Sequence, residues 1–355
     1  MKAIITAATT NHLRPLTHIK NKHLLELANK PLIFYAIEKV VSAGITEIGI
    51  VVKEGDTEIQ KVVGDGSRWG VKIRYIPQVG GAKGLAHAVY CAQNFVGSEP
   101  FMVYLGDNII NDDISVLREK FEKENINCLL SLAKVPRPER FGVPEFDNNG
   151  KILRIEERPI KPKSEYAVAG LYFYDNNAHK AYPHIKPSFR GSYEIADLHT
   201  WLAQNGYNVQ WQEIQGWWKD RGSALDLLEG NSLALDNIET GNEGKIENSV
   251  SVQGKVYIGK GAKIGGRSVI RGPVAIGDHC LIKDSYIGPY TSVGNKVEMH
   301  GAHIEHSIIY DGSAISTPQK ISGSIIGEHS IISDAEHETP KGTRLIVSGN
   351  SSLSI

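Results

Sequence analysis

The chain has 355 residues, which exceeds one domain of average size and allows at least one large hydrophobic core. Its 39 basic and 40 acidic residues leave a formal net charge of −1, which argues against broad binding to nucleic acid or membrane surfaces. A local basic pocket remains compatible with that balance. Three widely spaced cysteines, Cys91, Cys128 and Cys280, argue against a disulfide framework or a zinc site.

The same cysteine usage is typical of a reducing cytoplasm. We expect no signal peptide ahead of the first strand, and no apolar run approaches the ~18 to 20 residues needed to cross a bilayer. The expectation from composition is therefore a cytoplasmic α/β protein.

The beginning of the chain combines a short apolar strand, a polar loop and a helix. Ala3-Ile4-Ile5 predicts a buried strand, and Pro31 is well placed to open a helix over Leu32 to Ser42 that ends at Gly44. The polar segment 9–14 lies between them, where a loop normally offers backbone N–H groups to phosphates. Glycines let such a loop approach its ligand closely, but this segment has threonines and an asparagine instead.

Up to about residue 235, apolar strand-like runs alternate with helical stretches. Residues 48–52 and 101–105 are continuous apolar runs, as expected for a sheet covered on both faces. Residues 84–95 and 114–125 have helical spacing. This alternation predicts an α/β domain over residues 1–240, with an open, mostly parallel, Rossmann-like sheet that binds ligands at the carboxyl ends of its strands.

From about residue 245 the pattern changes, and aliphatic residues recur at roughly every sixth position, often followed by glycine. This repeat is the signature of a parallel β-helix, which we predict for residues 245–355, with a hinge at 236–242. A β-sandwich with regular turns is the alternative. The glycine-flanked positions are Ile258, Ile264, Ile276, Ile287, Val293 and Ile326, and a looser repeat includes Val269, Ile282 and Ile331.

Two aspartates occupy turns where a ligand could bind. Asp107 directly follows a buried strand, and Asp220 lies in a similar turn far along the chain. Two carboxylates with phosphate oxygens and water form a typical magnesium site. Taken singly, either aspartate is more often a turn or capping residue, so the pair gains its weight from the motifs that surround it.

Several motifs occur together and in a familiar order. They are LRPLTH at 13–18, Lys22, ANKPL at 28–32, GLAHAV at 84–89, YLGDN at 104–108, FGVPEFD at 141–147, IEERP at 155–159 and WKDRG at 218–222. With these motifs the chain resembles the sugar-1-phosphate nucleotidylyltransferases. It is most similar to the long-form glucose-1-phosphate thymidylyltransferases, which carry a C-terminal left-handed β-helix.

The resemblance implies an enzyme that joins a nucleoside triphosphate, dTTP or else UTP, to a sugar 1-phosphate such as glucose 1-phosphate, and releases pyrophosphate. Direct in-line attack on the α-phosphorus makes catalysis depend on positioning and charge neutralisation. Mg²⁺ is the implied cofactor, held by Asp107 and Asp220. The implied catalytic residues are Lys22, Asp107, Arg190 and Asp220.

The resemblance also implies two binding sites. The sugar phosphate would contact Gly142, Glu157, Arg158, Val168 and Arg190, although the family usually has lysine at the position of Arg158, with a different reach. The nucleotide would contact Ala7, Ala8, Thr9, Thr10, Asn11, His12, Arg14, Gln78 and Gly84.

Two of these assignments have open points. Gln78 matches the residue that reads the pyrimidine edge, but the segment from Gln78 to Gly84 is one residue longer than the usual spacing. Glu157 has the alternative of a surface salt bridge with Arg154 or Arg158.

The loop Thr9-Thr10-Asn11-His12 departs from the family pattern Gly-x-Gly-Thr-Arg and is one residue shorter. Threonine resists a positive φ, and His12, mostly neutral at pH 7, stands where an arginine would neutralise phosphate charge. Loss of one charge-assisted phosphate contact costs about 1.5–3 kcal/mol. The loop therefore bears on the rate and on the choice of nucleotide.

Three functions remain open from the sequence. A working nucleotidylyltransferase is favoured because Lys22, Asp107, Arg190 and Asp220 are all retained. A catalytically impaired relative that binds a nucleotide sugar as a regulatory or scaffold subunit is favoured by the altered loop. A bifunctional enzyme would use the β-helix histidines at 279, 300, 303 and 306 for acyl transfer, although solvated turns suit these positions better. The exposed edges of a β-helix also predict a homo-oligomer.

Overall fold

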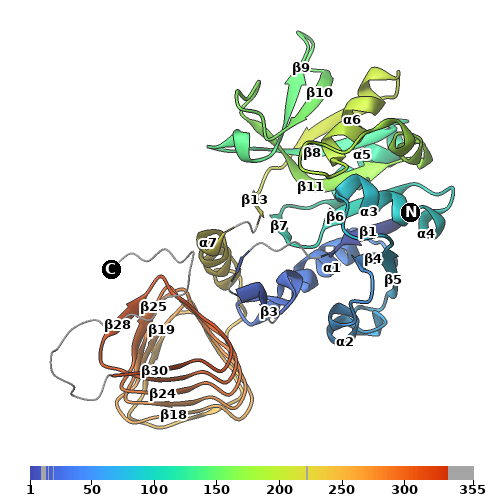
Figure 1. Ribbon diagram of the computed structural model, residues 1–355. Coiled ribbons are helices and arrows are strands. Elements are labelled where there is room, and N and C mark those ends of the chain that lie inside the picture. The colour runs from blue at the N-terminus through green and yellow to red at the C-terminus, as the bar shows by residue number, and fades with distance from the viewer. Residues whose placement is uncertain (9–12, 15, 19, 221–222, 335–355) are drawn as a thin grey trace. The chain divides into compact units, whose positions relative to one another are not determined.

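A computed structural model shows two compact units, Met1–Ile238 and Glu239–Ile355 (Figure 1). The division falls within the segment 236–242. The structure describes residues 1–8, 13–14, 16–18, 20–220 and 223–334, with the backbone alone for His18, Trp217, Lys219 and Asp220. The predicted phosphate loop, Thr9, Thr10, Asn11 and His12, lies outside the described residues.

The first unit is built on a seven-stranded sheet in the order β12-β8-β11-β6-β1-β4-β5. Only β11 runs antiparallel to its neighbours in this sheet, and the other described pairs are parallel. The prediction of a mostly parallel sheet is confirmed. The strands are β1 (Lys2–Thr6), β4 (Glu47–Lys53), β5 (Lys72–Gln78), β6 (Phe101–Leu105), β8 (Cys128–Lys134), β11 (Tyr166–Tyr174) and β12 (Val209–Glu213).

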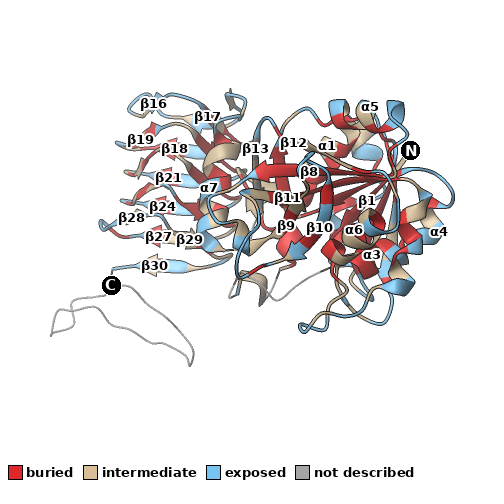
Figure 2. Ribbon diagram, turned by 90° about the horizontal axis from the view of Figure 1, so that it is seen from above, coloured by how far each residue is buried: buried red, intermediate tan, exposed pale blue. Residues whose placement is uncertain are grey.

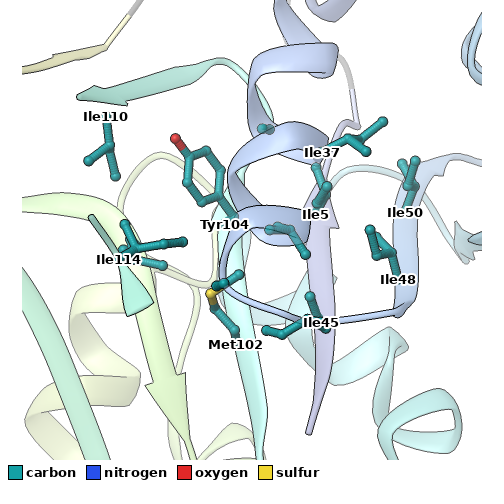
Figure 3. Packing of buried hydrophobic residues seen from close by; sticks show 14 of the residues in the cluster. Ile5, Ile37, Ile45, Ile48, Ile50, Met102, Tyr104, Ile110 and Ile114 are labelled. Carbon is teal, nitrogen blue, oxygen red and sulfur yellow. The ribbon is translucent and has the colours of Figure 1, made fainter. Parts of the chain in front are cut away.

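Helices cover both faces of this sheet, because successive side chains of its strands point to opposite sides. Ile5 of β1 packs into the cluster under α1 and α5, whereas Ile4 packs into the cluster under α3 and α6. Figure 3 shows Ile5, Ile48 and Tyr104 from adjoining strands together with Ile37 of α1. The buried residues form a continuous layer through the unit (Figure 2). The helices are α1 (Leu32–Ser42), α2 (Glu58–Val63), α3 (Leu85–Cys91), α4 (Gln93–Val96), α5 (Ser115–Lys123), α6 (Ile195–Gln204) and α7 (Ala224–Leu235).

The predicted first helix is confirmed residue for residue. Pro31 directly precedes α1, and Gly44 ends it with φ 74° while its N–H donates to Val41 O at 2.8 Å. The segment 84–95, predicted as one helix, forms two instead. Ala92 joins α3 to α4 with ψ near 0°, outside helical geometry, so the helix is interrupted there.

Two small antiparallel ribbons are separate from the seven-stranded sheet. The first pairs β7 (Asn108–Asn111) with β13 (Trp217–Asp220), and its register sets Asp220 opposite Asn108. The second pairs β9 (Gly142–Phe146) with β10 (Ile152–Glu157) and is anchored to α6 by the hydrogen bond from Ile155 N to Thr200 Oγ1 at 2.9 Å. A further short pair is β2 (Glu26–Leu27) with β3 (Lys30–Pro31).

The second unit is a left-handed parallel β-helix with a triangular cross-section (Figure 1), as predicted. Val256 pairs with Val274 and Val274 with Thr291, so each coil contains about three hexads. The first sheet holds β14 (Gly241–Asn242), β17 (Val256–Ile258), β20 (Val274–Ile276), β23 (Thr291–Val293), β26 (Ile308–Ile309) and β29 (Ile325–Ile326). The second holds β15 (Lys245–Ile246), β18 (Lys263–Gly265), β21 (Leu281–Lys283), β24 (Glu298–His300), β27 (Ala314–Ser316) and β30 (Ile331–Ser333). The third holds β16 (Ser251–Gln253), β19 (Val269–Arg271), β22 (Tyr286–Ile287), β25 (His303–Glu305) and β28 (Lys320–Ser322).

The predicted hexad repeat is shifted by one residue at two positions, Val269 and Ile331. Ile270, rather than Val269, is fully buried, and Ile331 is 80% exposed while Ile332 packs against the core. Neighbouring strand residues face opposite sides, so an assignment shifted by one residue reverses the burial. Among the described residues no helix combines the length and the apolar character needed to cross a membrane.

Candidate functional site

A cavity of about 640 Å³ opens at the carboxyl ends of β1, β5 and β6 in the first unit. This is the edge at which open α/β sheets bind ligands. The cavity brings together predicted residues that are far apart in the chain: Ala8, Lys22, Gln78, Gly84, Asp107, Gly142, Glu157, Arg158 and Val168. Ala7 is fully buried beside it, with its N–H on Val51 O at 2.8 Å, and Arg14 is exposed and not among the lining residues.

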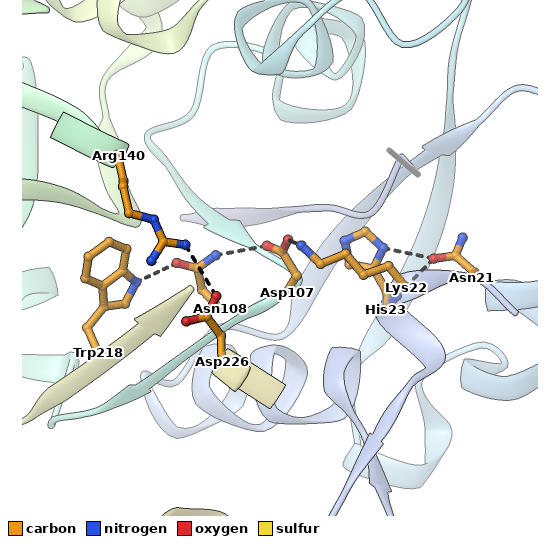
Figure 4. Close-up of polar contacts among 8 residues, drawn as sticks. All are labelled: Asn21, Lys22, His23, Asp107, Asn108, Arg140, Trp218 and Asp226. Carbon is orange, nitrogen blue, oxygen red and sulfur yellow. Dashed lines mark hydrogen bonds and ion pairs between the residues drawn. The ribbon is translucent and has the colours of Figure 1, made fainter. Parts of the chain in front are cut away.

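The ion pair between Lys22 and Asp107 lies in the wall of this cavity. The Nζ atom of Lys22 is 2.5 Å from Oδ2 of Asp107, and the lysine side chain is only 5% exposed (Figure 4). Burial opposes ionisation of Asp107, but the Lys22 ammonium and the hydrogen bond from Asn108 hold the pKa of that carboxyl well below its usual range. Asp107 is therefore a carboxylate at neutral pH.

A chain of hydrogen bonds fixes the other oxygen of this carboxylate. Asn108 donates from Nδ2 to Asp107 Oδ1 at 2.9 Å, and Trp218 donates from Nε1 to Asn108 Oδ1 at 2.5 Å (Figure 4). Trp218 packs edge-on against Phe141, with ring centroids 5.0 Å apart. Trp218 lies on β13, the strand that also carries Asp220. Through Asn108, this strand therefore helps to fix the orientation of the Asp107 carboxylate.

The predicted metal pair is compatible with the backbone register. Asp220 pairs with Asn108, the residue that follows Asp107, so both aspartates belong to one ribbon end. Its side chain lies outside what the structure describes. Among the described side chains no group of three or more His, Cys, Asp or Glu could hold a metal. Two carboxylates with phosphate oxygens and water suit a hard divalent cation.

Gln78, predicted to read the base, meets Gly84, another predicted nucleotide-binding residue, despite the longer segment between them. Gln78 ends β5 and is 1% exposed, and its Nε2 donates to Gly84 O at 3.1 Å. Gly84 has φ 107°, and a Cβ there would lie 2.7 Å from Tyr193 N, so only glycine fits this turn. The additional residue is accommodated by Gly80 and Gly81, which both have positive φ.

The predicted sugar-binding residues line another part of the cavity. Gly142 begins β9, and a Cβ at this position would lie 3.4 Å from Glu157 Oε2 and 3.8 Å from Val168 Cγ2. Arg158 has φ 49°, is largely exposed, and contacts Glu157 with its Nε at 3.6 Å. Arg190 lies next to the lining and reaches Glu157 Oε1 at 3.4 Å and Glu194 Oε1 at 2.9 Å.

These contacts resolve the alternative for Glu157. Arg154 pairs with Glu145 at 2.6 Å, whereas Glu157 takes Arg158 and Arg190 as its partners inside the site. Burial is the main cause that raises the pKa of Glu157. Glu157 therefore both forms the salt bridge with Arg158 and lines the cavity, so the two alternatives do not exclude each other.

Three residues of the site, His23, Asn108 and Trp218, have no role predicted from the sequence. His23 lies in the wall behind Asp107, where burial lowers its pKa to about 4, against the opposing pull of Asp107. Asn108 and Trp218 were part of recognised motifs, so the motifs contained them without indicating their hydrogen bond. His23 had no comparable signal, because an isolated histidine next to a lysine is common in loops.

A sheet edge that gathers a buried lysine, a carboxylate and a positioned amide is suited to binding a phosphorylated nucleotide. The family profile described as nucleotidyl transferase matches residues 2–237, and the chain belongs to this family.

The similarity to individual members extends over the whole chain. The chain is 38% identical to a glucose-1-phosphate thymidylyltransferase of Streptomyces griseus and 39% identical to one of Streptomyces antibioticus. Each alignment covers 100% of this chain and 99% of the relative. The chain is also 39% identical to the low-salt glycan biosynthesis nucleotidyltransferase of Haloferax volcanii, over 99% of both chains. A protein of Bacillus anthracis assigned as a glucose-1-phosphate thymidylyltransferase, crystallised with sucrose, superposes with a TM-score of 0.62 at 38% identity and covers 68% of this chain and 97% of its own.

Proposed function

We propose that the protein transfers a thymidylyl group from dTTP to glucose 1-phosphate in the presence of Mg²⁺, and so forms a thymidine diphosphate sugar and pyrophosphate. The observation that carries this proposal is one cavity lined by Gln78 and Gly84, by Gly142 and Glu157, and by the buried Lys22–Asp107 pair. Full-length relatives named for this activity support the choice of substrates.

The reaction is a displacement at phosphorus. An oxygen of the sugar phosphate attacks the α-phosphorus, a new P–O bond forms, and the bond to the β-phosphate oxygen breaks so that pyrophosphate leaves. Both reactants are anions, and positive charge around them accounts for most of the catalysis. Asp107 and Asp220 would hold Mg²⁺, which supplies charge neutralisation at the triphosphate.

Lys22 supplies a cation that is already buried in the cavity wall. Its present partner is Asp107, and the arrival of phosphate oxygens offers the ammonium a second anion at the same place. A lysine that is 5% exposed loses little further solvation when it binds phosphate. This supports Lys22 as a catalytic residue.

The sugar phosphate is assigned to Arg158 and Arg190, and the sugar itself to Gly142, Glu157 and Val168. Arg190 is oriented by Glu157 and Glu194, so its fork is held beside the cavity before the substrate binds. Absence of a side chain on Gly142 leaves room for a hydroxyl group against Glu157 Oε2. Ala7, Ala8 and Arg14, with the segment Thr9 to His12, are assigned to the triphosphate.

Two further properties belong to the proposal. Three free cysteines, of which Cys128 and Cys280 are buried, suit a reducing cytoplasm. Exposed Leu281 and Ile331 lie in one column of the β15-to-β30 sheet and support self-association. Light scattering on the purified chain measures the resulting subunit number.

The test is a substrate matrix. The purified chain is incubated with Mg²⁺, each of dTTP, UTP, dCTP, ATP and GTP, and a panel of sugar 1-phosphates, and pyrophosphate release is followed. We expect the highest kcat/KM with dTTP and glucose 1-phosphate, and loss of turnover on addition of a chelator that excess Mg²⁺ reverses. Tight binding of a nucleotide sugar without turnover of any pair would instead indicate the regulatory or scaffold role.

A further inference from the structure

The side-chain amide of Gln78 is held by protein groups on its nitrogen only. Nε2 lies 3.1 Å from the carbonyl oxygen of Gly84 and 3.1 Å from Nδ1 of His87. No described residue donates a hydrogen bond to Oε1, and Gln78 lines the cavity. An amide nitrogen carries two hydrogens, so both of its donors are in use.

The backbone carbonyl of Gly84 fixes the orientation of the Gln78 side-chain amide. A backbone carbonyl can only accept a hydrogen bond, so the atom of Gln78 that faces it must be the NH₂ group. A flipped amide would set two acceptors 3.1 Å apart with no hydrogen between them. Oε1 therefore points away from Gly84.

His87 Nδ1 accepts the second hydrogen bond from the Gln78 amide, and this fixes the tautomer of the His87 ring. Since Nδ1 accepts from Gln78, the proton of the neutral ring is on Nε2, which lies 3.5 Å from the Sγ atom of Cys91. Burial, with a smaller contribution from Lys83, lowers the pKa of His87, in keeping with a neutral ring. His87 is 7% exposed, and Tyr182 lies beside it with ring centroids 5.9 Å apart.

We propose that His87 is a specificity-determining positioning residue, which by accepting the second hydrogen of Gln78 locks the amide with Oε1 presented to the base. The inference rests on the proposed nucleotidyl transfer and deepens it. A fixed acceptor pairs with the N3–H of thymine or uracil. It meets the N3 lone pair of cytosine with no hydrogen to share, so cytosine nucleotides are rejected.

The hydrogen bond to His87 matters because the Gln78 amide could otherwise rotate by about 180° and exchange the positions of its oxygen and nitrogen. A Gln78 side chain held by Gly84 alone keeps one hydrogen free, and rotation about its last bond at the cost of one hydrogen bond would offer NH₂ to a cytosine N3. With His87 in place two hydrogen bonds must break together. Discrimination between bases, rather than binding of phosphate, is therefore the property that His87 controls.

The test compares His87→Leu with His87→Asn, which retains an acceptor close to the position of Nδ1. The dissociation constants of dTTP and dCTP are measured by calorimetry, and kcat and KM are measured with glucose 1-phosphate. For His87→Leu we expect the preference for dTTP over dCTP to fall roughly tenfold, mainly through tighter binding of dCTP, with kcat for dTTP changed by less than about threefold. For His87→Asn we expect most of the preference to return.

Controls separate this role from folding and from the proposed reaction. His184→Leu, the same replacement at an exposed histidine, should leave the preference unchanged, and thermal unfolding shows whether each variant is folded. An unchanged preference in folded His87→Leu, or His87→Asn as defective as His87→Leu, would overturn the inference. Absence of turnover in the unmodified chain would refute the proposed reaction alone, because the binding preference remains measurable.

Discussion

The Nζ atom of Lys22 lies 2.5 Å from the carboxylate of Asp107, and this pair joins the proposed phosphate ligand directly to the proposed metal ligand. In the free protein each residue neutralises the other within the cavity wall. Substrate phosphate and a divalent cation would replace that pairing with stronger partners for both. The pair thus neutralises two buried charges in the free protein, and on the proposed function it would be exchanged for substrate phosphate and the cation.

Lys22→Met should destabilise the fold, because it leaves the Asp107 carboxylate buried without its cation. We expect a loss of about 3 kcal/mol in the free energy of unfolding, measured with urea. Adding Asp107→Asn should restore part of it, so the two changes are not additive. Lys30→Met removes a far more exposed pair with Glu38 at 2.7 Å and should cost less than about 1 kcal/mol. Full additivity in the double variant would contradict the coupling.

Asp107→Asn tests the metal assignment through activity. The amide retains the shape of the side chain but not its charge, so we expect kcat to fall by about 10²- to 10³-fold or more. The matched control is Asp147→Asn, in the turn between β9 and β10, where Oδ1 accepts from Asn149 N at 2.8 Å. That variant should retain its rate. A fully active Asp107→Asn protein would refute the role of Asp107.

Gly84→Ala should disrupt the turn that holds Gln78. A Cβ there would lie 2.7 Å from Tyr193 N, with φ at 107°, and we expect a loss of about 2–4 kcal/mol in stability together with weaker nucleotide binding. Gly81→Ala has a similar φ of 95° but no atom within 4 Å, so it measures the backbone cost alone, about 1 kcal/mol. Equal losses in both, measured by thermal unfolding, would exclude the contact with Tyr193 as the cause.

Gly142→Ala should separate sugar binding from stability. The new Cβ meets Glu157 Oε2 and Ile155 Cγ2 at 3.4 Å, which the fold can tolerate with small adjustments, but it occupies space in the cavity. We expect the KM for glucose 1-phosphate to rise about tenfold, with the KM for dTTP and the melting temperature little changed. A rise confined to the KM for dTTP would mean that the sugar site lies elsewhere.

His179→Phe should flatten the acid side of the stability profile. His179 stacks on Phe101 at 5.0 Å, and neither ring nitrogen has a hydrogen-bond partner among the described residues. Burial lowers its pKa from 6.5 to about 4. Because the unfolded chain takes up a proton more readily, the contribution of His179 is complete above pH 6.5 and is lost as the pH falls toward 4.

The size of that loss is about 2 kcal/mol near pH 4.5. Phenylalanine keeps the stacking and cannot be protonated, so urea unfolding between pH 7 and 4.5 should show a shallower decline in His179→Phe. An unchanged slope would indicate that other groups cause the acid sensitivity.

The fold was predictable where local chemistry and spacing act alone. Pro31 and Gly44 bound the first helix as expected, and the hexad repeat identified the β-helix. Errors arose where the pattern leaves a shift of one residue undetermined, as at Ile331, or where a helix breaks without glycine or proline, as at Ala92.

The site was predictable only as a set of residues. The motifs named Lys22 and Asp107, yet nothing in the sequence indicates that these residues, 85 positions apart, form an ion pair in the free protein. The hydrogen bonds that link Gln78, Gly84 and His87 likewise depend on a turn through two glycines with positive φ. Such contacts follow from tertiary packing rather than from local spacing.

The most direct test of nucleotidyl transfer is a ³¹P NMR spectrum of dTTP, glucose 1-phosphate and Mg²⁺ before and after addition of the protein. We predict that the triphosphate and monoester signals decline together while a nucleotide sugar and pyrophosphate appear in equal amounts, and that Asp107→Asn leaves the spectrum unchanged. The proposed nucleotidyl transfer would be contradicted if the dTTP and glucose 1-phosphate signals stayed undiminished after prolonged incubation, in a sample that binds a nucleotide sugar tightly.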